Sequence, residues 1–103
     1  MRKGCRVWGN AERLPEEGFS RIRRELPFEV VEFSKGSLNI EHEAWSVDPA
    51  MVEQAAEAIA RELAPTGFGQ IDLIDHNEGF ILRFSIEHGA VKSRKTGIDD
   101  LLG

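Results

Sequence analysis

Apolar residues recur at helical spacing between residues 48 and 64. Five of them form one narrow stripe, and charged residues occupy the opposite side: Val52, Ala55, Ala56, Ile59 and Leu63. Asp48 is placed to cap the first turn, and Pro49 suits the first helical position, where no N–H is needed. Pro65 and Gly67 indicate an end near residue 64. The pattern predicts an amphipathic helix that packs on a sheet.

A period of two follows this helix and predicts a β-hairpin. The first strand covers residues 70 to 75, and residues 76 to 79 form the turn, in which Gly79 supplies a positive φ. On the return strand four large apolar residues share one face: Phe80, Leu82, Phe84 and Ile86. A slip of one residue would turn all four to water, so we expect a firm register.

The first half of the chain predicts a similar set of elements. A short strand over residues 4 to 8 ends at a Gly9-Asn10 turn. A helix opens at Pro15, buries Phe19, Ile22 and Leu26, and stops at Pro27. Two strands, over residues 28 to 34 and 37 to 45, are joined by a tight turn at 35 and 36.

These elements read βαββαββ along the chain. The order favours an α+β fold, a two-layer sandwich in which two helices lie on one face of an antiparallel sheet. Its first six elements match the ferredoxin-like split order, with a strand added at the end. We expect one domain over residues 1 to 90. Residues 91 to 103 are predicted to be a mobile tail, because the polar run from Lys92 to Gly97 has no apolar side chains for a core.

Composition narrows the class of partner. The chain has 103 residues and a net charge of −5, and its charge is unevenly spread. Residues 1 to 24 hold seven Lys/Arg and three Asp/Glu, whereas residues 25 to 88 hold three and thirteen. An acidic centre argues against a sheet that binds phosphate backbones. A single cysteine, no apolar run of membrane-spanning length and no apolar signal sequence together predict a cytoplasmic protein and no membrane partner.

The candidate chemistry does not assemble into a catalytic motif. His42 and His88 are in phase with the apolar faces of their strands, and two adjacent hairpins would bring them toward one end of the sheet. Their spacing matches no metal motif, so no metal site is predicted. The carboxylates alternate with apolar residues, as on a solvated face, and Cys5 has no identifiable base at a meaningful spacing. We therefore predict neither enzymatic activity nor a cofactor.

One stretch of four residues resembles part of an enzyme family. Residues 6 to 9, Arg-Val-Trp-Gly, resemble the start of acylphosphatases, which share the ferredoxin-like order. In that family a glycine-rich phosphate loop ending in arginine should follow. Here residues 10 to 14 read Asn-Ala-Glu-Arg-Leu, so no catalytic role is carried over.

Aromatic and basic residues are the best candidates for an interaction surface. Tryptophan and arginine are favoured anchors at protein interfaces. The apolar residues near the C-terminus suit a short docking peptide. The candidates are Trp8, Arg21, Arg24, Trp45, Leu101 and Leu102. The sequence thus predicts a non-catalytic module that binds a protein partner or dimerises. The alternative is a single-stranded RNA or DNA binder that uses Trp8 and the N-terminal arginines.

Overall fold

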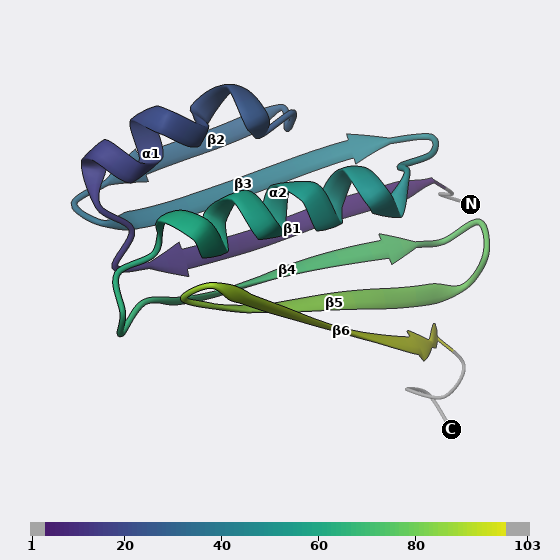
Figure 1. Ribbon diagram of the computed structural model, residues 1–103. Coiled ribbons are helices and arrows are strands. Elements are labelled where there is room, and N and C mark those ends of the chain that lie inside the picture. The colour runs from purple at the N-terminus through teal and green to yellow at the C-terminus, as the bar shows by residue number, and fades with distance from the viewer. Residues whose placement is uncertain (1–3, 99–103) are drawn as a thin grey trace.

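The structure, a computed structural model, describes residues 4–98 (Figure 1). Within this range the chain forms six strands, two α-helices and one short 3-10 helix. In chain order they are β1 (Cys5–Glu12), α1 (Glu16–Ile22), η1 (Arg23–Glu25), β2 (Val30–Ser34), β3 (Ser37–Ala44), α2 (Pro49–Glu62), β4 (Phe68–Asp75), β5 (Phe80–Glu87) and β6 (Ala90–Gly97). The small α+β fold is confirmed.

All six strands join one antiparallel sheet in the order β2-β3-β1-β4-β5-β6. The first strand of the chain is therefore an inner strand, flanked by β3 and β4. The two connections that contain helices each pass over a strand that lies between the strands they join. As a result, β1 carries its side chains into the middle of both sheet faces.

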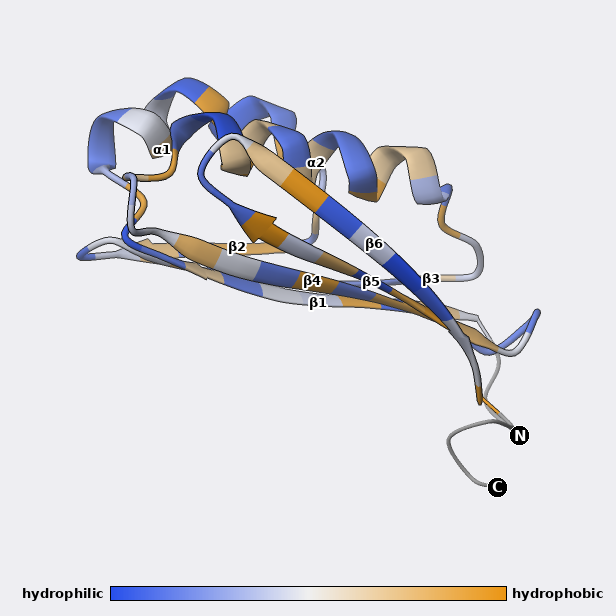
Figure 2. Ribbon diagram, turned by 60° about the horizontal axis from the view of Figure 1, so that its bottom comes forward, coloured by the Kyte–Doolittle hydropathy of each residue, from blue (hydrophilic) through white to orange (hydrophobic). Residues whose placement is uncertain are grey.

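The two helices lie on the same side of the sheet (Figure 2). On β1, Cys5, Val7 and Ala11 are buried on this side, whereas Arg6 and Trp8 are exposed on the other. Neither α-helix in the described range has both the length and the apolar character that a membrane span requires.

The predicted strand count was wrong by one, because β6 occupies residues that we assigned to a tail. β6 pairs with β5 along its full length, from Glu87 opposite Ala90 to Phe80 opposite Gly97. Backbone pairing and a two-residue turn at His88-Gly89, with Gly89 at φ +73°, make this strand, although most of its side chains are polar and exposed. Strand formation does not test the mobility that we expected for residues 91–103, so that mobility stays a prediction.

The first strand is longer than predicted, since residues 9 and 10 continue it rather than turn. Gly9 lies against its neighbours so closely that an added Cβ would come within 2.8 Å of the Gln70 carbonyl oxygen. The same Cβ would come within 2.9 Å of Ile71 Cγ1. Gly9 therefore serves close packing and not a reversal of the chain.

The predicted second helix and its faces are confirmed. Asp48 Oδ1 accepts a hydrogen bond from the Ala50 N–H at 2.9 Å, and Pro49 is the first helical residue. All five residues of the predicted stripe are buried: Val52, Ala55, Ala56, Ile59 and Leu63. The helix contacts β4, β5 and β6, so its apolar side covers one half of the sheet.

The first helix is shorter than predicted and passes into η1 at Arg23. Ile22 and Leu26 of the predicted stripe are buried, and Phe19 stacks on Phe33 of β2 with ring centroids 4.5 Å apart. Gly18 faces α2, where an added Cβ would meet Glu62 Cβ at 2.9 Å. A glycine that lowers helix propensity thus allows the two helices to approach.

Candidate binding face of the sheet

The outer face is the side of the sheet that points away from the helices. Strand register and alternation define it. Its residues are Val30, Glu32 and Ser34 on β2; Ser37, Asn39, Glu41 and Glu43 on β3; Arg6, Trp8, Asn10 and Glu12 on β1; Phe68, Gln70, Asp72 and Ile74 on β4; Ile81, Arg83, Ser85 and Glu87 on β5; and Ala90, Lys92, Arg94 and Thr96 on β6. No α-helix of the described range covers this face (Figure 2).

Trp8 occupies the middle of the outer face and is 46% exposed. Its direct neighbours across the strands are Glu41 on β3 and Asp72 on β4. Phe68, 55% exposed, stands on the same face at the start of β4. Large aromatic side chains that remain this accessible on a folded sheet are typical of a contact surface.

Charge divides the outer face into two halves. The β2–β3 half carries Glu32, Glu41 and Glu43. The β5–β6 half carries Arg83, Lys92 and Arg94, with Glu87 at its far end. Trp8 lies between an acidic area and a basic area, a division that net charge conceals.

Asp72 and Arg83 form an ion pair next to Trp8. Arg83 Nε donates to Asp72 Oδ1 at 2.9 Å, and its Nη2 donates to Oδ2 at 3.1 Å. Gln70 Nε2 lies 3.5 Å from Asp72 Oδ2. Asp72 is only 7% exposed, and its carboxylate raises the pKa of Arg83, chiefly through these hydrogen bonds. The pair fixes the Arg83 guanidinium on the face.

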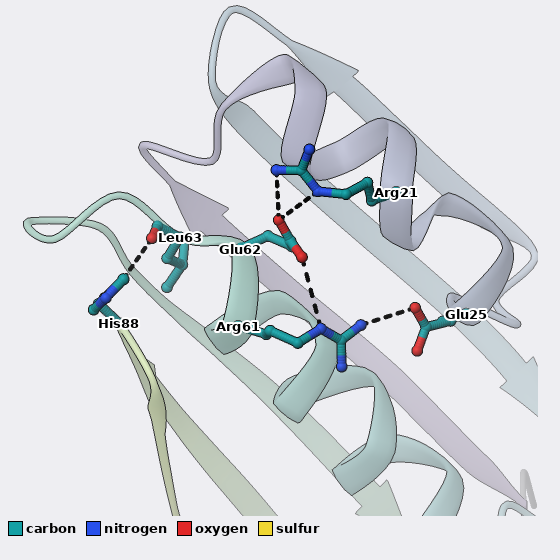
Figure 3. Close-up of polar contacts among 6 residues, drawn as sticks. All are labelled: Arg21, Glu25, Arg61, Glu62, Leu63 and His88. Atoms are coloured by element: carbon teal, nitrogen blue, oxygen red, sulfur yellow. Dashed lines mark hydrogen bonds and ion pairs between the residues drawn. The ribbon is translucent and has the colours of Figure 1, made fainter.

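Arg21, predicted as part of one surface with Trp8, lies on the helical side of the sheet (Figure 3). Its Nε and Nη2 contact Glu62 Oε1 of α2 at 2.9 and 2.8 Å. The same carboxylate is 3.6 Å from Arg61 Nε, and Arg61 Nη2 reaches Glu25 at 2.9 Å. Arg21 thus joins the two helices.

The remaining predicted contact residues are scattered. Arg24 is an exposed residue of η1, on the helical side with Arg21. Trp45 follows β3 and is 71% exposed, and its carbonyl accepts from Asn77 Nδ2 at 2.8 Å. Leu101 and Leu102 lie outside the described residues. The structure therefore keeps Trp8 and Trp45 at different places on the surface and does not bring either arginine to Trp8.

A hollow of about 320 Å³ lies beside Trp45, lined also by Arg6, Glu43 and His76. Cys5 borders it but is buried. Burial raises the pKa of the Cys5 thiol, and the nearby Asp75 carboxylate raises it further. A protonated thiol is a poor nucleophile, so this hollow has no activated cysteine.

His42 and His88 do not meet. His42 on β3 is level with Val7, accepts the Glu29 N–H at Nδ1 and packs edge-on against Phe28. His88 follows β5 near the other end of the sheet, with Nδ1 2.6 Å from the Leu63 carbonyl oxygen (Figure 3). Among residues 4–98 there is no group of three or more metal-ligating side chains.

Comparisons with known protein families, with curated proteins and with solved structures found no match to this chain.

Sequence reasoning missed the basic half of the outer face, because it left β6 out of the sheet. The signal was present: His88-Gly89 separates two stretches by two residues, and a residue followed by glycine at this spacing is typical of a tight hairpin. Recognising it would have placed Arg94 opposite Arg83.

Proposed function

We propose that this protein is a non-catalytic binding module that recognises a protein partner, or a second copy of itself, through the outer face of its sheet. The observation that carries the proposal is the exposure of Trp8 on an inner strand of a sheet face without a covering helix in the described range. Tryptophan at the centre of a contact surface is a common energetic anchor. Polar and charged neighbours on both sides suit the rim of such a surface.

The proposed fold is a two-layer variant of the ferredoxin-like sandwich. In this description β1 to β4 and both helices form the split unit, and the β5–β6 hairpin widens its sheet. The sheet is then one complete layer, and its outer face is the proposed binding surface. A free, buried Cys5 supports a reducing cytoplasmic location.

The chemistry of the face supports binding more than catalysis. Asp72, the buried carboxylate of this face, is held by Arg83 and so is not available as a general base. The acidic residues Glu32 and Glu41 are exposed to solvent and alternate with buried or half-buried residues that face the helices. On this face the exposed carboxylates therefore resemble a solvated surface rather than an acid–base pair.

The second candidate is single-stranded RNA or DNA binding. Arg6 and Trp8 favour it, since both point to the outer face from one strand. Glu41 and Asp72, which flank Trp8, oppose it by repelling phosphate. Retention of a labelled oligonucleotide at low salt, lost in Trp8→Ala and Arg6→Glu, would favour this candidate over a protein partner.

The experiment for the proposed function compares two tryptophan variants. Trp8→Ser removes the proposed anchor, whereas Trp45→Ser removes a more exposed tryptophan elsewhere and is the matched control. Immobilised wild type and Trp45→Ser should retain the same protein from an extract of the source cells, and Trp8→Ser should lose it. Sedimentation tests whether the protein binds a second copy of itself, since a dimer would have twice the 11.5 kDa mass of one chain. The proposal would be refuted if wild type, Trp8→Ser and Trp45→Ser all retained the same proteins and if Trp8→Ser had the same mass in solution as wild type.

A further inference from the structure

Two arginines face each other across the β5–β6 pair. Arg83 and Arg94 are direct partners in the register. Ile81 and Thr96 are the next pair on the same face, two residues further along each strand. All four side chains are on the outer face and line one hollow of about 260 Å³. Like charges directly opposite each other on a sheet destabilise it, so this pair does not serve the stability of the hairpin.

Only one of the two arginines has a partner. Arg83 uses Nε and Nη2 for Asp72, which fixes its guanidinium and leaves Nη1 without a partner among the described residues. The Arg94 side chain makes no hydrogen bond and no ion pair with any residue of 4–98, although its backbone is part of the β5–β6 ladder. The hollow therefore combines one orientated guanidinium with one uncompensated positive charge.

The remaining two residues complete a small polar site on an apolar base. Thr96 adds a hydroxyl that donates one hydrogen bond, and Ile81 adds an apolar surface beside it. Guanidinium groups bind carboxylate and phosphate oxygens with two parallel hydrogen bonds, a geometry that a monatomic anion such as chloride cannot satisfy.

We propose that Arg83, Arg94 and Thr96 form a binding site for an oxyanion, a carboxylate or a phosphate group. The site goes beyond the proposed function, because it binds this group whether the group belongs to a protein or to a small molecule. It shares the outer face with Trp8, since β1 and β5 are separated only by β4, about 10 Å from strand to strand. A ligand that contacts Trp8 can therefore reach it.

A different role for Arg94 makes a different prediction. Charged side chains on an edge strand discourage pairing with other chains, and β6 is an edge strand. That role depends on charge alone, so lysine would serve as well as arginine. The oxyanion site depends on the shape of the guanidinium, which lysine lacks.

The test is a titration of the protein with an anion, in which NMR monitors the backbone amide signals of residues 81 to 83 and 94 to 96 and the side-chain signals of the two arginines. Inorganic phosphate and triglutamate are the two probes, and sodium chloride at matched ionic strength is the blank. Arg94→Gln should weaken binding at least about tenfold, and Arg94→Lys should weaken it by several fold. Lys92→Gln is the matched control, because it removes a positive charge from the same strand and face without touching the hollow, and we expect a change within about twofold.

Each result is decisive. Binding of phosphate but not triglutamate identifies a phosphate ligand, and the reverse identifies a carboxylate; both support the site. Signals that move no further than in sodium chloride overturn it, and so does a loss in Lys92→Gln equal to that in Arg94→Gln. Neither probe needs a protein partner, so failure here is distinguishable from failure of the Trp8-dependent retention.

Discussion

Arg83 and Asp72 are joined by two hydrogen bonds, of 2.9 and 3.1 Å, on the outer face of the sheet, where Asp72 is almost fully buried. We predict that Arg83→Gln lowers the free energy of unfolding by about 1–2 kcal/mol, because the buried carboxylate loses its charged donor. This value is modest because about half of the Arg83 side chain is exposed, and solvent weakens the pair. Urea unfolding measures it.

Arg94→Gln is the control for that change. It removes the opposite guanidinium, which has no partner among the described residues, so stability should change by less than about 0.5 kcal/mol. In Arg83→Gln, adding Asp72→Asn should recover part of the loss, since a neutral amide needs no counter-charge. Equal losses in the two arginine variants would contradict the assigned role of the ion pair.

Gly9 is predicted to tolerate no side chain. The Cβ of Gly9→Ala would come within 2.9 Å of Ile71 Cγ1 and 3.2 Å of Ile40 Cγ1, on the two strands that flank β1. We expect a loss of about 1–3 kcal/mol from overpacking. Thermal unfolding followed by circular dichroism checks this, with Ser85→Ala on the outer face as a nearly neutral control. A Gly9→Ala variant as stable as wild type would show that the strands move apart at little cost.

The Arg21–Glu62 ion pair predicts a pH-dependent link between the helices. Its hydrogen bond lowers the pKa of Glu62 in the folded state below the usual value of 4.5. The contribution is therefore present above pH 4.5 and is lost as pH falls through the lower folded value. Glu62→Gln should be less stable than wild type at pH 7, and the difference should close in acid.

The matched control for Glu62 is Glu53→Gln, on the same helix. Glu53 makes no ion pair with a described residue, so its variant should stay near wild type at pH 7. Urea titrations across the pH range give the comparison. A Glu62→Gln deficit that persists unchanged in acid would exclude the ion pair as its cause.

Cys5 should react slowly with thiol reagents in the folded protein. Burial raises its pKa above the usual 9.0, with Asp75 as a further cause, so the thiol stays protonated near neutral pH. Because the folded pKa is the higher one, the associated stability is present below pH 9.0 and is lost as pH rises through the folded value. Alkylation rates with and without urea measure the protection. A native rate equal to that in urea would show that Cys5 is accessible.

Local patterns accounted for most of the secondary structure. The α2 stripe, its Asp48 cap and the alternation of β5 are all visible in the sequence, because each depends on residues close along the chain. The errors lie where pairing outweighs side-chain pattern. β6 has little apolar character and forms through backbone bonds to β5, and Gly9 continues a strand because its neighbours leave no space for a side chain.

The candidate site was less predictable than the fold. That Trp8 and Arg6 share a face follows from alternation alone. That Trp8 stands in mid-sheet follows from strand order, which places the first strand of the chain between β3 and β4. Arg21 is on the helical side because α1 packs against α2 there, and Arg83 and Arg94 meet at one hollow through the β5–β6 hairpin.

The amino-acid sequence by itself determined both helices, most of the strands and the apolar side of each, because these depend on periodicity and on capping within a few residues; β6 and the second half of β1 were the exceptions. Only the tertiary structure decided which residues of distant segments become neighbours. Antiparallel pairing brings together strands that are far apart in the chain, and it leaves one face of the sheet, with Trp8 at its middle, pointing away from both helices.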